Sequence, residues 1–534
     1  MSKVRVASLS KGDPVSPILP RKTLRDLLID IALMPMLFSP RLSSIVLSKS
    51  GILSGSENRK GTPMQDLRSF LSLAEKAGEL IRVDRETDPL TEMGVLFGET
   101  EHPLLFEKVR GYPSWQVCGE LVTSRAAQAV ALQVERSQVV PELARRMQVG
   151  TLPPRIVSTG PVKERVLTGH DVDLKKLPVI VHSEKDGGPY IGSAMCVTKD
   201  PDTGIQNVAM LRMQIQDRNR TGTAFAPRHS WMHYQKYEAR NEPMPMAAVI
   251  GHHPLLDLAT NSSVPYGVDE FHVAGSLLQE PVEMVPCETI DLKVPAHAEI
   301  VIEGVVPPGI REDEGPFGEF QCYYLTRTRK CPIFEIKAIT MRHDALYRHI
   351  QATPSTVEHQ ALVALPMEAH LWQRIKDVDG FIDLKDVHVP PWGACFVVLI
   401  KFTPRLEEQA KSVLMAALSS SYVHPKIAIA LDDDIDLTDP RDVFWAVATR
   451  VDPSRDLLQI PQARIHPLDP SGRLVTAPGA GHQRVGGKLG IDATKPPICR
   501  PKDREEFERV LPMGHGQISL QQVLGAIASQ GGLR

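Results

Sequence analysis

Residues 299–306 (EIVIEGVV) and 334–341 (FEIKAITM) alternate apolar and polar side chains, a pattern typical of strands that bury one face. Turns rich in glycine and proline separate runs of this kind from about residue 165 to about residue 345. Because short strands joined by such turns tend to pair with one another, we predict an antiparallel sheet or a small barrel for this segment.

On both sides of this segment the pattern changes to that of an α/β fold. Residues 62–160 alternate short strands with helical stretches, and apolar residues recur at helical spacing from Leu67 until Gly78, where a helix would end. After residue 355 helical and strand-like stretches alternate again. The pattern predicts helices over 124–135, 356–378, 406–418 and 520–528 and strands over 395–402 and 426–431.

The composition is that of a globular protein. The chain has 534 residues, and at roughly 100–200 residues per domain this length suggests about three domains. Lysine and arginine number 61 against 64 acidic residues, so the basic excess of proteins that coat nucleic acid or anionic membranes is lacking. The seven cysteines form no Cys-x-x-Cys pair, which gives no support to a zinc ribbon, and we expect a cytoplasmic protein with reduced thiols.

Residues 1–61 differ from the rest in being rich in serine and in basic residues. Their apolar run, 27–38, is interrupted by Asp30 and Pro35 and spans about 12 residues where a membrane crossing needs roughly 20. We expect no membrane span here. The segment is predicted to be a disordered extension or the result of a start codon assigned too early, with Met64 as the true beginning.

Two carboxylates dominate the segment 312–320, which reads EDEGPFGEF. Glu314 and Glu319 flank a Gly-Pro-Phe-Gly turn that can direct both towards one cavity. Carboxylates that lie close together repel, which raises the pKa of at least one and makes it usable as an acid near neutral pH. A nearby arginine would keep the other ionised and could also bind a substrate carboxylate.

Other motifs fail at required positions. The glycine-rich segment 478–490 lacks two residues of a phosphate-binding loop. The acidic run 432–436 lacks the glycine and the closing glutamate of a calcium loop, which favours a solvated strand end. His229 and His233 have the spacing of a metal pair on a helix, but Ser230 stands where a zinc protease needs glutamate, so only one of the two remains a candidate ligand.

The segment EGPFGE (314–319) resembles the signature of the UbiD family, decarboxylases that use prenylated FMN. The resemblance extends in the family's order from about Met64 to about residue 510. The other matching segments are NVAMLR (207–212), GVDEFHVAG (267–275), HPKIAIALDDDIDLTDPRDVFWAVATRV (424–451) and GGKLGIDATKP (486–496).

This resemblance implies a carboxy-lyase in which the cofactor accepts the electrons released when CO2 leaves. Arg212 would orient the substrate carboxylate and pair with Glu314, and Glu319 would deliver the proton that replaces CO2. A divalent ion, typically manganese, would bridge to the cofactor phosphate with Asn207, His229 and Glu270 as its ligands. A potassium ion would lie nearby. The further cofactor contacts that the resemblance implies are those of Ala209, Met210, Leu211, Arg212, Arg228 and Lys488.

The resemblance also implies a domain order. An N-terminal α/β domain (62–164) precedes a central antiparallel split barrel that holds prenylated FMN (165–350). A C-terminal α/β oligomerisation domain (351–510) and a tail with a short helix (511–534) follow. We expect a homodimer or a dimer-based hexamer, and a flavin prenyltransferase that supplies the cofactor.

The leading hypothesis is a reversible decarboxylase of an aromatic, heteroaromatic or α,β-unsaturated acid. Two alternatives stay open: a decarboxylase of a CoA-thioester of an aromatic acid, and a non-catalytic flavin- or metal-binding subunit of a decarboxylase complex. Residues five apart in a regular strand face opposite sides. Asn207 and Arg212 can therefore share a cofactor only if the strand is irregular, and we predict an irregularity between Val208 and Leu211.

Overall fold

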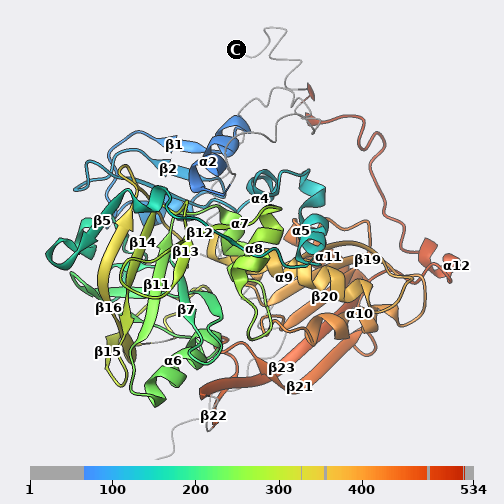
Figure 1. Ribbon diagram of the computed structural model, residues 1–534. Helices are drawn as coiled ribbons and strands as arrows, with labels where there is room; N and C mark the ends of the chain where they lie inside the picture. Colours follow the sequence, from blue (N-terminus) through green and yellow to red (C-terminus); the bar gives the residue numbers. More distant parts are fainter. Residues whose placement is uncertain are drawn as a thin grey trace, which may run out of the picture. The chain divides into compact units, whose positions relative to one another are not determined.

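The centre of the protein is an antiparallel ten-stranded sheet. In the computed structural model, which describes residues 65–148, 150–325, 327–353, 358–477, 481–520 and 522–523, its strands follow the order β6-β9-β10-β16-β14-β11-β7-β8, and β5 and β15 also pair with β16. The path ends at β8 and β6, so the sheet is open there, and the predicted fold class is confirmed (Figure 1). The strands are β5 (Arg165–Thr168), β6 (Tyr190–Ile191), β7 (Met195–Lys199), β8 (Gln206–Met210), β9 (Met213–Asp217), β10 (Arg220–Thr223), β11 (Met244–Ile250), β14 (Ile300–Val306), β15 (Arg311–Glu314) and β16 (Arg329–Met341).

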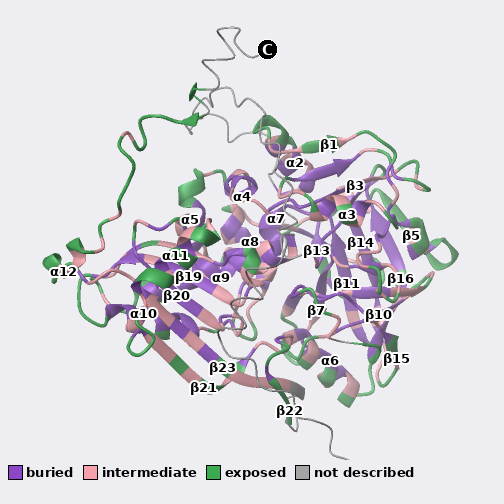
Figure 2. Ribbon diagram, turned by 180° about the vertical axis from the view of Figure 1, so that it is seen from behind, coloured by how far each residue is buried: buried purple, intermediate pink, exposed green. Residues whose placement is uncertain are grey.

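Both faces of this sheet are covered. The middle strands β7, β11 and β14 are buried along almost their whole length, as Figure 2 shows. Burial on both faces explains their nearly continuous apolar sequences. A small sheet of β4 (Arg155–Ile156), β12 (Glu283–Pro286) and β13 (Lys293–Pro295) also belongs to this part of the chain, together with the helices α6 (His229–Ala239), α7 (Pro254–Thr260) and α8 (Glu270–Leu278).

The N-terminal region contains a four-stranded sheet, in the order β1-β2-β3-β17. Its last strand comes from a distant part of the chain, since Leu346–Arg348 pair in parallel with Gln116–Cys118. Asp66 caps the first described helix by accepting a hydrogen bond from Ser69 N at 2.8 Å. The elements are α2 (Leu67–Lys76), β1 (Ile81–Val83), α3 (Met93–Gly98), β2 (Leu104–Phe106), β3 (Gln116–Gly119), α4 (Arg125–Leu132), α5 (Val139–Gln148) and β17 (Leu346–Arg348).

The C-terminal region is a six-stranded mixed sheet with helices on both faces. Alternate residues of β19 face different cores: Val398 and Ile400 pack with residues of α9 and α10, whereas Leu399 packs with residues of α11. The elements are α9 (Glu358–Lys376), β18 (Asp383–His388), β19 (Val397–Thr403), α10 (Gln409–Leu418), β20 (Ile427–Leu431), α11 (Pro440–Arg450), β21 (Leu457–Ile465), β22 (Arg473–Ala477), β23 (Gly481–Ala493) and α12 (Pro501–Glu505).

These bounds agree with the predicted elements to within a few residues. The helices predicted over 124–135, 356–378 and 406–418 are α4, α9 and α10, and the strands predicted over 395–402 and 426–431 are β19 and β20. The N-terminal extension and most of the helix predicted over 520–528 lie outside the described residues. No helix within the described ranges has the length and hydrophobicity that a bilayer crossing requires.

A buried ionic network joins the three regions. Arg348, in β17, pairs with Asp257 of α7 and, at 2.7 Å, with Glu358, the first residue of α9. The backbone N–H of Glu358 donates to Glu120, which follows β3, at 2.8 Å. All four side chains are buried, and burial raises the pKa of Glu120 and Glu358. One arginine therefore holds together carboxylates from separate sheets and helices.

We predict that Arg348→Met lowers the free energy of unfolding by about 3–5 kcal/mol, because it leaves carboxylates buried without their cation. Urea unfolding followed by fluorescence measures this loss. Arg441→Met is the matched control, since the Arg441 side chain is 90% exposed and its one partner among the described residues is Asp439 at the surface. Equal midpoints for the two variants would contradict the prediction.

Candidate active site

The site begins where β8 ends. Pairing between β8 and β7 is regular from Gln206 to Met210, so the predicted irregularity is not a bulge within this stretch. The chain instead leaves the strand at Leu211 and Arg212 and starts β9 at Met213. Because the strand ends before Arg212, the two-residue alternation that sets the side-chain directions in β8 does not apply to Arg212.

Arg212 lies between two glutamates. Its Nε donates to Glu314 Oε1 at 3.0 Å and its Nη1 donates to Glu319 Oε1 at 2.5 Å. The guanidinium carbon also lies 4.5 Å from the centre of the Phe317 ring, in the loop between the two acids. Glu314 is the last residue of β15, and Gly315 follows with φ of +102°, which turns the chain so that Glu319 returns to the same arginine.

The electrostatics of the cluster favour an ionised Glu314. Burial alone would raise its pKa, but the charge and hydrogen bonds of Arg212 outweigh burial and hold the pKa of Glu314 below its ordinary value. The charge of Arg329, at 3.4 Å, adds to this effect. The Cys331 thiol also donates to Glu314, at 3.6 Å. Burial alone would lower the pKa of Arg212, but Glu319 and Glu314 raise it above its ordinary value. Arg212 therefore keeps its charge.

A second group of side chains meets at the start of α6 and α8. One end of the Asn207 amide lies 3.1 Å from His229 Nδ1 and 3.2 Å from a carboxylate oxygen of Glu270. Hydrogen bonding to these two groups favours the amide NH2 at this end, whereas a cation would favour the amide oxygen. Glu270 also accepts a hydrogen bond from Val208 N at 2.7 Å, yet burial raises its pKa to about 8. An amide oxygen, an imidazole nitrogen and a carboxylate that converge in this way are a donor set that suits a divalent ion such as manganese.

The remaining predicted cofactor residues divide into two groups. Ala209 and Leu211 pack with one hydrophobic core of the protein, and Met210 packs with another. Arg228 is exposed and precedes α6. Lys488 lies in β23 of the C-terminal sheet, where its Nζ donates to the Leu418 carbonyl at 2.6 Å. Lys488 therefore contacts the end of α10 in the C-terminal region.

Three histidines that the sequence analysis did not single out surround Phe320, the residue after Glu319. The ring centres of His359, His424 and His466 lie 5.7, 6.1 and 5.4 Å from that of Phe320. Burial lowers the pKa of His359 and His466 to about 4, so their rings are neutral at pH 7. His424 begins the matching segment 424–451, but nothing in the sequence joined it to His359 and His466, because the three come from separate elements.

A cavity of about 520 Å³ borders the loop that carries Glu319. Gly318 forms part of its wall, so this loop is accessible from one side. Its lining is Gly94, Val95, Gly98, Glu99, His182, Ser183, Gly318, Cys322, Tyr323, Tyr324, Gln351 and Thr353.

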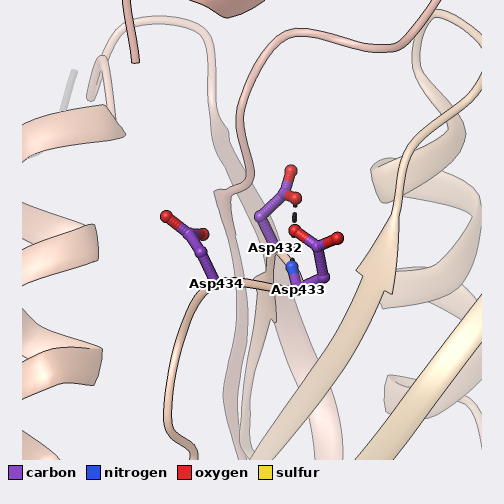
Figure 3. Close-up of side chains that lie close together, drawn as sticks. All are labelled: Asp432, Asp433 and Asp434. Atoms are coloured by element: carbon purple, nitrogen blue, oxygen red, sulfur yellow. Dashed lines mark hydrogen bonds between the residues drawn. The ribbon is translucent and has the colours of Figure 1, made fainter. Parts of the chain in front are cut away.

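The acidic run after β20 is not a solvated strand end, and that prediction was wrong for Asp432. Asp432 is buried and binds both terminal nitrogens of Arg504, at 3.0 and 2.6 Å. Asp434 binds Arg450 and Lys495, while Asp433 is exposed; Figure 3 shows the three acids side by side. Since cations of the chain already neutralise two of the acids, the run ties the segment after β23 to the sheet.

The central antiparallel sheet is flanked by two α/β regions, and it holds an arginine between two glutamates. This combination of fold and site is that of one class of enzymes. The model described as the 3-octaprenyl-4-hydroxybenzoate carboxy-lyase Rift-related domain matches residues 155–354, and the corresponding N-terminal and C-terminal domain models match 71–147 and 360–493. The chain belongs to the UbiD family and is a carboxy-lyase, as the matched segments predicted.

A curated relative and solved structures of UbiD-class enzymes are similar to the chain over most of its length. The chain is 32% identical over 448 residues to anhydromevalonate phosphate decarboxylase of Methanothermobacter thermautotrophicus. The aligned region covers 83% of this chain and 99% of that protein. The structure of the UbiD-class enzyme HmfF from Pelotomaculum thermopropionicum in complex with FMN is 37% identical with a TM-score of 0.78, and covers 86% of this chain and 99% of HmfF. An evolved dimeric form of HmfF in complex with prFMN is 35% identical with a TM-score of 0.74, at the same coverage.

We predict that His229→Gln reduces the manganese content of the purified protein at least about tenfold, because it removes a nitrogen ligand from the Asn207–Glu270 group. Elemental mass spectrometry of protein produced with added manganese measures the content. His233→Gln is the control: His233 lies one turn further along α6 and pairs with Thr198 Oγ1 at 3.0 Å. If His233→Gln loses the metal and His229→Gln keeps it, the assignment is wrong.

Proposed function

We propose that the protein is a reversible, non-oxidative decarboxylase of an aromatic, heteroaromatic or α,β-unsaturated carboxylic acid, with prenylated FMN as cofactor. The observation that carries this proposal is the half-buried Arg212 that Glu314 and Glu319 share. A protein that only bound a flavin would need no such cluster. The FMN and prFMN complexes of HmfF support the cofactor.

Decarboxylation leaves a pair of electrons on carbon, and bound prenylated FMN supplies the electron sink for them. The chain supplies position and a proton. Arg212 orients the substrate carboxylate, and Glu314 holds the guanidinium in place from the other side. Glu319 then gives its proton to the carbon that CO2 has left, and in the reverse direction it takes the proton from that carbon.

Metal and cofactor phosphate would be held at the start of α6 and α8. Asn207, His229 and Glu270 provide oxygen and nitrogen donors for a manganese ion, which would offset the charge of the phosphate. The exposed Arg228 lies next to His229 and adds a positive charge on the same side. Lys488 would contribute its positive charge to the cofactor if its Nζ exchanged the Leu418 carbonyl for the flavin or its phosphate.

Copies of the chain would associate through the C-terminal region. Its surface carries exposed aromatic residues, among them Phe444 at 61% and Phe381 at 65% exposure. Phe444 lies next to Trp392, with ring centres 6.2 Å apart. Exposed aromatic residues of this kind are typical of subunit contacts, so we propose a homodimer or an oligomer built from dimers.

Mass spectrometry and absorbance of the small molecules released from the protein test the cofactor. The chain is produced together with a flavin prenyltransferase, and we expect prenylated FMN at close to one per chain. The loaded protein is then offered 4-hydroxybenzoate, furan-2-carboxylate, cinnamate and anhydromevalonate phosphate, the last because of the relative named for it. Protein that carries no flavin, or that consumes no acid when loaded, would reject the proposal.

We predict that Glu319→Gln lowers turnover at least about 100-fold while prenylated FMN and manganese stay bound, because the amide has no proton of suitable acidity to give. Steady-state rates and cofactor content measure the two effects. Glu312→Gln is the matched control, since Glu312 comes from the same segment but pairs with Arg220. A Glu319→Gln rate close to that of wild type would show that another group supplies the proton.

A further inference from the structure

A second loop holds the loop that carries Glu319. It is the turn 183–188 (SEKDGG), which precedes β6. Asp186 Oδ1 accepts a hydrogen bond from Gly318 N at 2.8 Å, and the backbone N–H of Gly187 donates to the Pro316 carbonyl at 2.8 Å. The peptide before Glu319 is therefore anchored by a side chain outside the EGPFGE segment.

The two loops approach each other too closely for larger residues. A Cβ on Gly187 would lie 2.4 Å from the Gly315 carbonyl oxygen, and a Cβ on Gly318 would lie 2.9 Å from Ser183 Oγ. Gln214 of β9 closes the arrangement from below: its Nε2 donates to the Gly187 carbonyl, and its Oε1 accepts from Gly315 N. The position of the Asp186 carboxylate relative to Gly318 is thus fixed by packing as well as by hydrogen bonds.

Asp186 is a carboxylate without a cation of its own. None of the ion pairs among the described residues includes it, and its hydrogen bonds come from the backbone N–H groups of Gly318 and Ser183. Burial raises the pKa of Asp186 to about 6, which the two N–H bonds and the charge of Arg212 only partly offset. The titratable groups that face it are Arg212, Glu319 and the phenol of Tyr190.

We propose that Asp186 is a positioning residue for Glu319. It holds the Gly318 N–H and with it the peptide that carries the acid, and its negative charge opposes loss of the proton that Glu319 must deliver. This inference rests on the proposed role of Glu319 as proton donor. No motif of the sequence pointed to it, since Asp186 and Glu319 are far apart in the chain and meet only through the docked turn.

Two variants separate the anchor from the charge. Asp186→Asn keeps an oxygen that accepts from Gly318 N, but it removes the charge and the acceptor for Ser183 N. Asp186→Ala removes all three. Glu319 must be protonated when it acts, so turnover falls as pH rises on the alkaline side. Without the charge at residue 186 the proton is held less firmly, and we expect the alkaline limb of the kcat profile of Asp186→Asn to move to lower pH by about one unit. For Asp186→Ala we expect kcat to fall about 10- to 100-fold at every pH, because the acid is displaced.

The holoenzyme and the fastest acid of the four named above are used for these profiles. Glu184→Gln is the matched control: it removes the same charge from the same turn, but Glu184 is exposed, and its profile should overlay that of wild type. A purely structural role for Asp186 would lower the rate of both variants without moving the limb. An Asp186→Asn profile that coincides with wild type would therefore overturn the role of the charge.

A readout without turnover keeps this inference distinct from the proposed function. Amide hydrogen exchange of the peptide 315–320 should be at least about tenfold faster in Asp186→Ala than in wild type and unchanged in Asp186→Asn, because only the former releases the Gly318 N–H. If wild type consumes no acid but this exchange pattern appears, the proposed function fails and the anchor stands. If exchange in Asp186→Ala equals wild type, the positioning role itself is wrong.

Discussion

A guanidinium is buried in a protein only where carboxylates neutralise it, and Arg212 meets this requirement with two at once. Its partners come from one short loop, while the arginine itself comes from the gap between β8 and β9. The cluster can form only if both segments are placed to within a hydrogen-bond length. Most of the central sheet serves this requirement: regular pairing of β8 with β7 and of β15 with β16 fixes the two ends from which the arginine and the first glutamate project.

Buried ion pairs also join separate elements elsewhere in the protein. Arg348 unites Asp257 and Glu358, and Arg504 unites β20 with the segment after β23 through Asp432. In each case the cation and the carboxylate lie in different elements, and for Asp257 and Asp432 the partner arginine is distant in sequence. Breaking such a pair leaves a charge in a medium that cannot solvate it, so these contacts specify which elements pack together more sharply than apolar contacts do. The active-site cluster is the instance in which the charges also face a reactant.

Local pattern was enough to predict the elements, and a set of short motifs was enough to predict the family. Alternation in 334–341 locates β16, and the spacing within 356–378 locates α9 to within two residues at each end, because these signals arise from neighbours in the chain. What the sequence could not show depends on distant partners. Parallel pairing of β17 with β3, burial of Asp432 by Arg504, and the three histidines around Phe320 leave no periodic trace. The break after Met210 falls within the interval in which an irregularity was predicted, but it is the end of a strand and not a bulge, because strand alternation does not say which kind of irregularity occurs.

The balance of charge around Arg212 explains why this arrangement suits proton transfer. Glu314, Glu319 and Asp186 bring three carboxylates, whereas the positive charges are Arg212 and Arg329, whose side chain is 42% exposed and therefore partly screened. A partly buried site with one more acid than base lowers its energy by keeping a proton. Arg212 holds the pKa of Glu314 low, whereas burial raises the pKa of Asp186. Gly318, whose N–H donates to Asp186, borders the cavity. The Arg348 network also has more carboxylates than cations, but its side chains are fully enclosed. The active-site cluster differs in that its loop borders a cavity, so a proton held there can reach a reactant.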